Sequence, residues 1–158
     1  MKKLFVAGLF LFTVASLSAQ TKITKQSIIG KWAVAVVEVK DIIYYNVETD
    51  SLSLGALMKA QLKDEQQAAA AVAMAKPGLA MFAKSTFTFN ENGTAELETG
   101  LEPVQKVKYS VDEVNSTITT VQEDKKEDIM KAEMLTDRLR ISVKQPQGDI
   151  LMILKKAK

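Results

Sequence analysis

Apolar and polar residues alternate along most of the chain beyond residue 30. The alternation is strict over residues 85–89 and again over residues 138–145. A period of two is that of a β-strand with one buried face. Short polar turns separate the alternating segments, and the Asn92-Gly93 pair supplies the positive φ angles of a hairpin turn. The pattern predicts eight antiparallel strands joined in chain order, or nine if residues 41–47 form a strand of their own.

One segment breaks this alternation with the spacing of a helix. Between residues 53 and 75, leucine, methionine, alanine and valine recur at three- and four-residue steps. Alanine, glutamine, lysine and glutamate fill the remaining positions and are strong helix formers. Ser53 is a candidate N-cap, and Pro77-Gly78 is expected to end the helix. We therefore expect a mainly β domain with one long helix inserted over about residues 53–75.

The first and last strands, near residues 31–40 and 150–156, are apolar on both faces. If Trp32 and Val36 face inward, Val37 faces outward. Strands buried on both sides need a cover on their outer face. We expect the helix to lie on the outer wall, over the seam between these two strands. In the alternative, the helix lies over the barrel mouth as a lid and leaves the outer patch to a partner or a membrane surface.

Two short motifs resemble the lipocalin-like families, which are small antiparallel β-barrels of envelope and secreted proteins. They are the Gly30-Lys31-Trp32 start of the first strand and the Phe-x-Phe, Asn-x-Asn-Gly-Thr hairpin that follows residue 86. The resemblance implies that Trp32 plugs the closed end of the barrel and that Gly30 lets the chain turn beneath it. It also implies a basic residue across the Trp32 face, where Lys155 or Lys156 stands in place of the usual arginine; we take Lys155 as the candidate. The alternative to a closed barrel is an open curved sheet wrapped on the helix.

The first nineteen residues have the pattern of a secretory signal peptide. Lysines follow Met1, an apolar run covers residues 4–15, and small residues precede the expected cut after Ala19. A membrane anchor is the alternative, but the run is shorter than the ~20 residues of a spanning helix. The segment resembles leaders of exported Bacteroidetes proteins. We expect a single soluble domain over residues 20–158, located in the periplasm or secreted.

Composition argues against several classes of function. Removing residues 1–19 takes away two lysines and leaves a formal charge of zero, which gives no general attraction to nucleic acid. The chain has no histidine and no cysteine, which excludes Ser-His and Cys-His nucleophiles and zinc sites built from nitrogen or sulfur. We therefore predict a protein that is not an enzyme, carries no metal or cofactor and does not span a membrane.

Candidate ligand residues come from the apolar positions of the predicted strands. They are Phe87, Phe89, Tyr109, Met130 and Met134. An eight-stranded barrel either holds one small ligand or is filled by its own side chains. The first case predicts an exported binding protein for a small apolar molecule. The second predicts a structural or interaction protein of the envelope. Neither interpretation fixes an oligomeric state.

Overall fold

The structure is a computed structural model that describes residues 20–99, 103–122, 124, 126–146 and 148–157. The predicted signal peptide, residues 1–19, lies outside the described residues. In the described part of the chain, no helix is both long and apolar enough to cross a lipid bilayer.

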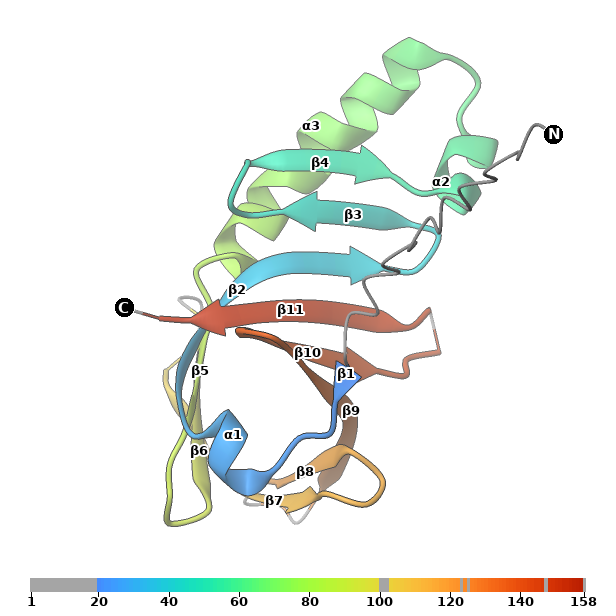
Figure 1. The fold of residues 1–158 in the computed structure, drawn as a ribbon. Helices are drawn as coiled ribbons and strands as arrows, with labels where there is room; N and C mark the ends of the chain where they lie inside the picture. Colours follow the sequence, from blue (N-terminus) through green and yellow to red (C-terminus); the bar gives the residue numbers. More distant parts are fainter. Residues whose placement is uncertain (1–19, 100–102, 123, 125, 147, 158) are drawn as a thin grey trace, which may run out of the picture.

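The described strands form one antiparallel sheet (Figure 1). Their bounds are β1 (Gln20–Thr21), β2 (Gly30–Val39), β3 (Ile43–Asn46), β4 (Ser51–Leu54), β5 (Thr86–Phe89), β6 (Thr94–Glu98), β7 (Gln105–Asp112), β8 (Thr117–Val121), β9 (Glu127–Leu135), β10 (Arg138–Val143) and β11 (Ile150–Lys156). Strand β2 and strands β5 to β11 pair in chain order, and β11 pairs back onto β2. The prediction of an eight-stranded up-and-down barrel is confirmed, and the open sheet is excluded.

A β-bulge in β2 changes which side chains face inward. Leu154 of β11 pairs with Val34 and Ile153 pairs with Val36, so that Ala35 is an extra residue in β2. An extra residue shifts the inside-outside alternation by one position. Val37 therefore joins Val34 in the barrel core, and the expectation that it faces outward is wrong.

The hairpin of β3 and β4 extends the sheet beyond the barrel. Strand β2 pairs with β5 over its first residues and with β3 over its last ones. Within this extension Tyr45 pairs with Val37, which pairs in turn with Met152 of the barrel core. Paired residues share a face of the sheet, so Tyr45 marks the face that continues the barrel interior. We call it the interior-side face.

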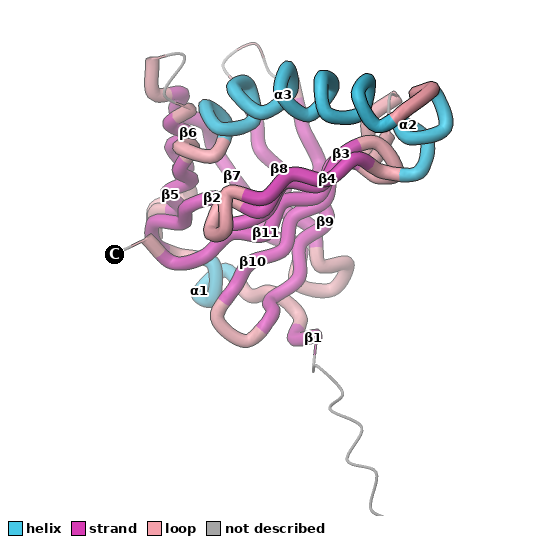
Figure 2. Tube along the Cα trace, turned by 90° about the horizontal axis from the view of Figure 1, so that it is seen from above, coloured by secondary structure: helices cyan, strands magenta, loops and turns pink. Residues whose placement is uncertain are grey.

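Helix α3 (Glu65–Phe82) packs on β4. It lies behind β3 and β4 in Figure 1, and Figure 2 shows it on the opposite side of these strands from α1. Tyr45 and Leu54 are buried, whereas the neighbouring Tyr44 is 39% exposed. The helix thus covers the interior-side face of the hairpin, and the expected position over the β2–β11 seam is wrong. The outer side of the seam keeps Leu151 and Ile153 only half-buried.

The helical region also has different bounds from those expected. Residues 51–54 are a strand, and a short helix α2 (Ala56–Gln61) follows it. Helix α3 begins after Asp64, whose side chain accepts a hydrogen bond from the backbone N–H of Gln67. It runs through Pro77, which lies at an exposed position, and ends five residues later. A proline at the helix surface removes one backbone bond without placing its ring in a packed interface.

One end of the barrel is closed by the short helix α1 (Lys25–Ile28) and by Trp32. The Trp32 side chain is 1% exposed, and its Nε1–H donates to the Ile28 carbonyl at 2.7 Å. Thr24 caps α1 through a capping box with Ser27. We call this end, where α1 also meets the β7–β8 turn, the closed end. Gly30 has a φ of +116°, which other residues rarely adopt, and this conformation lets the chain enter β2 beneath Trp32.

Candidate functional site

The barrel interior is packed around Tyr109 and hollow toward the end opposite α1. Along β7, for example, Tyr109 is buried, whereas Val107 and Gln105 line a cavity of about 350 Å³. The cavity opens opposite α1, because α1 lies at the β7–β8 turn, where the Lys25 N–H donates to Glu113. We call it the mouth cavity. Its apolar walls are Phe87, Phe89, Ala95, Leu97, Val107, Met130 and Val143.

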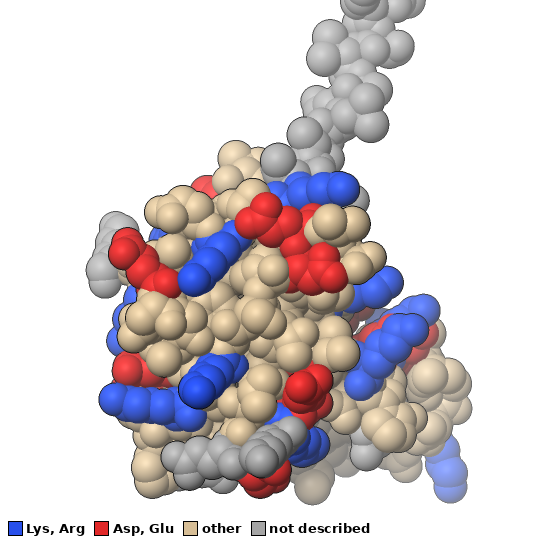
Figure 3. All heavy atoms as spheres, turned by 90° about the horizontal axis from the view of Figure 1, so that it is seen from below, with Lys and Arg blue, Asp and Glu red and all other residues tan. Residues whose placement is uncertain are grey.

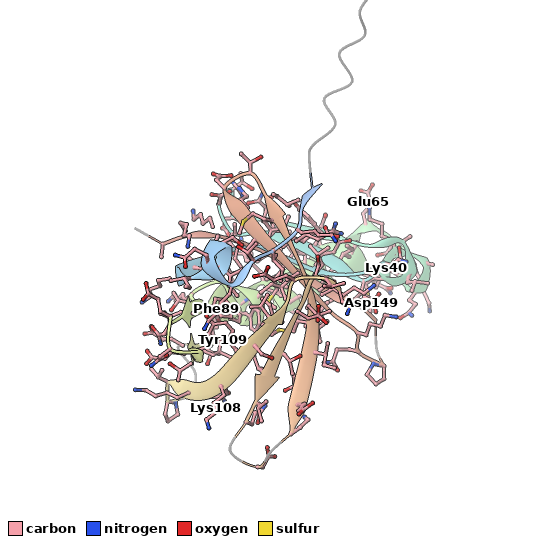
Figure 4. All side chains as sticks on the ribbon, turned by 60° about the horizontal axis from the view of Figure 1, so that its bottom comes forward. Lys40, Glu65, Phe89, Lys108, Tyr109 and Asp149 are labelled. Carbon is pink, nitrogen blue, oxygen red and sulfur yellow. The ribbon has the colours of Figure 1, made fainter. Side chains whose placement is uncertain are left out.

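The floor of the mouth cavity rests on an aromatic pair. The rings of Phe89 and Tyr109 meet edge to face, with centroids 5.2 Å apart, and lie side by side in Figure 4. The Tyr109 hydroxyl donates to the Asn90 carbonyl at 2.9 Å. Burial raises the pKa of Tyr109, so this hydroxyl keeps its proton at neutral pH. Tyr109 therefore supports Phe89 from below.

The rim of the mouth cavity is polar and of mixed charge. Its residues are Glu96, Gln105, Thr120, Gln122, Lys126, Asp128 and Gln145. The Gln122 amide donates to Asp128 at 3.2 Å, and Lys106 lies 3.4 Å from the Glu96 carboxylate. Apolar walls below a few polar groups are typical of small-molecule sites. Such a pocket suits an apolar molecule with a polar end at the rim.

The structure brings together three of the five candidate ligand residues. Phe87, Phe89 and Met130 line the mouth cavity, and Tyr109 lies beneath Phe89. Met134 belongs instead to a separate hollow at the closed end. Met130 and Met134 face inward on the same strand, but four residues along a strand separate them by about 13 Å. Alternation shows that a residue faces the barrel interior, but it does not show at which end of the barrel the residue lies.

Sequence reasoning missed part of the cavity wall. Leu97, Val107 and Val143 line the mouth cavity, and each lies at an alternating apolar position of its strand. Their signal is the same period of two that identified Phe87 and Phe89. The aromatic and methionine side chains drew attention because they are larger.

The closed-end hollow measures about 480 Å³ and is lined by Trp32, Met134 and several charged side chains. Lys155 Nζ lies 2.9 Å from Glu48, and Arg138 lies 3.0 Å from the same carboxylate. These two hydrogen bonds hold the pKa of Glu48 below its ordinary value. The lining contains Arg138, Lys155 and Lys156 against Glu48 and Asp137, so its formal net charge is +1, and Glu48 already binds two of the three cations.

Lys156, and not Lys155, lies over Trp32. Its Nζ is 4.0 Å from the centroid of the ring and also donates to the Ile29 carbonyl. Neighbouring residues of a strand point to opposite faces, so Lys155 faces Glu48 instead. Burial lowers the pKa of Lys156.

Two further hollows, of about 390 and 400 Å³, lie beside Lys106 and beside Ile129. Seen from below, basic and acidic side chains are interspersed without a broad area of one sign (Figure 3). Among the described residues, no three acidic side chains gather where they could hold a metal ion.

Comparisons with protein-family models, with curated proteins and with solved structures found no match. The closed eight-stranded antiparallel barrel is nevertheless consistent with the fold implied by the lipocalin-like resemblance. The barrel and its mouth cavity are therefore the basis of the functional assignment.

Proposed function

We propose that this chain is an exported, non-catalytic, lipocalin-like binding protein that holds a small apolar ligand in the mouth cavity. The observation that carries the proposal is the hollow of about 350 Å³ with apolar walls above a packed base. This volume is near the lower end of the ~300–1,000 Å³ found for small-molecule sites. The Gly30-Lys31-Trp32 start supports the lipocalin-like assignment, and the pattern of residues 1–19 supports export.

The walls and rim suggest the chemistry of the ligand. Phenylalanine, leucine, valine and methionine side chains take up an apolar body without hydrogen bonds. Methionine adapts its shape to different ligands, and Met130 lies within this wall. The amides of Gln122 and Gln145 at the rim offer both donors and acceptors. A compact molecule with one apolar end and one polar end fits this arrangement.

The first test is mass spectrometry of natively purified protein, with the expectation of a co-purified small lipid or similar apolar molecule. The second is titration with N-phenyl-1-naphthylamine, an apolar dye whose fluorescence rises in apolar surroundings. Met130→Gln puts an amide in the cavity wall and should weaken dye binding about tenfold, because burying an amide costs about 1–3 kcal/mol.

Met134→Gln is the matched control, because Met134 lies on the same strand but lines the closed-end hollow. Its dye affinity should stay within about twofold of the wild type if the mouth cavity is the site. Absence of dye binding together with absence of a co-purified molecule would favour the envelope interaction protein. Equal effects of the two substitutions would place the dye elsewhere.

A further inference from the structure

Strand β4 is a free edge of the sheet. It ends the strand order, and in the described part of the chain it pairs only with β3. The Gly55 N–H donates to the Ile42 carbonyl at 2.8 Å, so residues 42 and 55 form a hydrogen-bonded pair. Antiparallel pairs alternate between hydrogen-bonded and non-bonded types. The backbone groups of Ser53 therefore face β3, while those of Leu52 and Leu54 point away from the sheet.

Apart from its short length, this edge lacks the features that usually block pairing with another chain. Natural proteins protect edge strands with lysine, proline, bulges or short length. The β4 sequence, Ser-Leu-Ser-Leu, contains no charge and no proline, and its register with β3 is regular. Its length of four residues limits an added strand to a short segment.

Helix α3 continues past this edge. In Figure 1 its N-terminal part runs beyond β4, where the sheet has no further strand. None of its 18 residues is fully buried, although Ala68, Ala71 and Val72 are half-buried. The hairpin therefore covers the apolar side of the helix only in part. A strand added to β4 would have one face opposite this part of α3.

The chemistry at the edge is uncharged. Asp50 precedes β4 and forms an ion pair with Lys76 at 2.7 Å, so this carboxylate is already neutralised by the helix. Between Glu65 and Lys76, α3 contains only glutamine, alanine, valine and methionine. An occupant with charges along its centre would find no partner for them here.

We propose that the β4 edge accepts a short extended segment of a partner protein as an additional antiparallel strand. The segment has apolar side chains at alternate positions facing α3 and uncharged polar side chains on the other face, which matches the alternation of β4. The backbone groups of Leu52 and Leu54 supply its hydrogen bonds, as in other cases of strand addition. A second copy fits less well, because twofold pairing of two β4 strands would bring a second α3 onto the face where the first already extends past the edge.

The test uses a fluorescein-labelled, end-blocked peptide of alternating threonine and valine, followed by fluorescence anisotropy with the whole protein. The expected result is saturable binding, together with slower hydrogen exchange at the Leu52 and Leu54 amides. The control is the same peptide N-methylated on its valine amides, which lie opposite Leu52 and Leu54 in the proposed pairing; this peptide cannot donate to β4 and should not bind.

Two substitutions at one position separate the backbone group from the side chain. Leu52→Pro removes the outward N–H and leaves the hydrogen bonds to β3, as proline does on edge strands. Leu52→Ala shortens the side chain and keeps the N–H. The proline variant should bind the peptide about fivefold or more weakly than the alanine variant, provided circular dichroism shows both folded.

Three results would overturn the proposal. One is the absence of binding by the unmodified peptide, and another is equal binding by the N-methylated one. The third is a concentration-dependent dimer in light scattering whose Leu52 and Leu54 amides are protected without peptide. That result would show that a second copy occupies the edge.

Discussion

Trp32 is the largest fully buried side chain among the described residues. Its ring is buried among core residues, and its Nε1–H satisfies the Ile28 carbonyl. Trp32→Ala should lower the free energy of unfolding by about 3–5 kcal/mol, as emptying a large aromatic site does. Chemical denaturation measures the change, with Lys31→Ala at the exposed neighbouring position as the control. An equal midpoint for the two variants would contradict the plug.

The two lysines that end β11 should have separable effects. Trp32 is the one tryptophan in the chain, so its fluorescence reports on its surroundings alone. Lys156→Met removes the cation 4.0 Å from the ring and should shift the emission and its quenching. Lys155→Met, one residue away, removes a partner of Glu48 and should leave the emission unchanged. Identical spectra for Lys156→Met and the wild type would contradict the stacking.

At the level of elements, α3 starts later than its sequence pattern indicates. Asp64 caps it, so Asp64→Ala should cost about 1 kcal/mol of stability. Ser53→Ala, at the N-cap expected from the pattern, lies in β4 and should change helicity little. Circular dichroism and chemical denaturation of both variants measure the difference. A larger loss of helicity in Ser53→Ala than in Asp64→Ala would instead support a helix that begins at Ser53.

The confusion between strand and helix over residues 51–54 has a physical cause. Leu52 and Leu54 alternate as in a strand, but Leu54, Leu57 and Met58 also have helical spacing. A short segment fits both periods, and pairing with β3 decides between them. Likewise, Pro77 was expected to end the helix, but it is accommodated because it lies at the surface.

At the level of the whole molecule, two carboxylates in the β3–β4 loop connect the hairpin to the rest of the chain. Glu48 pairs with Arg138 and Lys155 of the barrel, and Asp50 pairs with Lys76 of α3. Hydrogen bonds from Lys155 and Arg138 lower the pKa of Glu48, and those from Lys76 and Tyr45 lower the pKa of Asp50.

A carboxyl group whose pKa is lower in the folded protein than in the unfolded chain stabilises the fold at pH values above its unfolded pKa. This contribution is lost as the pH falls through its folded pKa. Stability should therefore drop below about pH 4, beginning with the contacts of the hairpin. Denaturation midpoints measured from neutral to acid pH test this. The Glu48→Gln, Asp50→Asn double variant should be less stable at neutral pH, and its stability should fall less than that of the wild type as the pH is lowered. An equally steep loss of stability in the double variant and the wild type would contradict this prediction.

The sequence by itself determined the eight strands of the barrel and their order. Period-two alternation, the Asn92-Gly93 turn and short connections leave few topologies other than an antiparallel meander. The roles expected of Gly30 and Trp32 were those implied by the lipocalin-like resemblance, and the structure shows the positive φ angle and the buried ring that these roles require. Phe87, Phe89 and Met130 were candidates because they lie at apolar positions of the predicted strands.

Only the tertiary structure decided the rest. The extra residue at Ala35 is visible only in the pairing of β2 with β11, and it turned Val37 inward. The hairpin created a second apolar face, and α3 covered that face and not the seam. The packed core around Tyr109 and the hollow mouth of the barrel depend on how side chains from different strands meet at each depth. Each of these features depends on contacts between segments far apart in the chain. The pattern of a single segment shows only its own period and which of its faces are apolar.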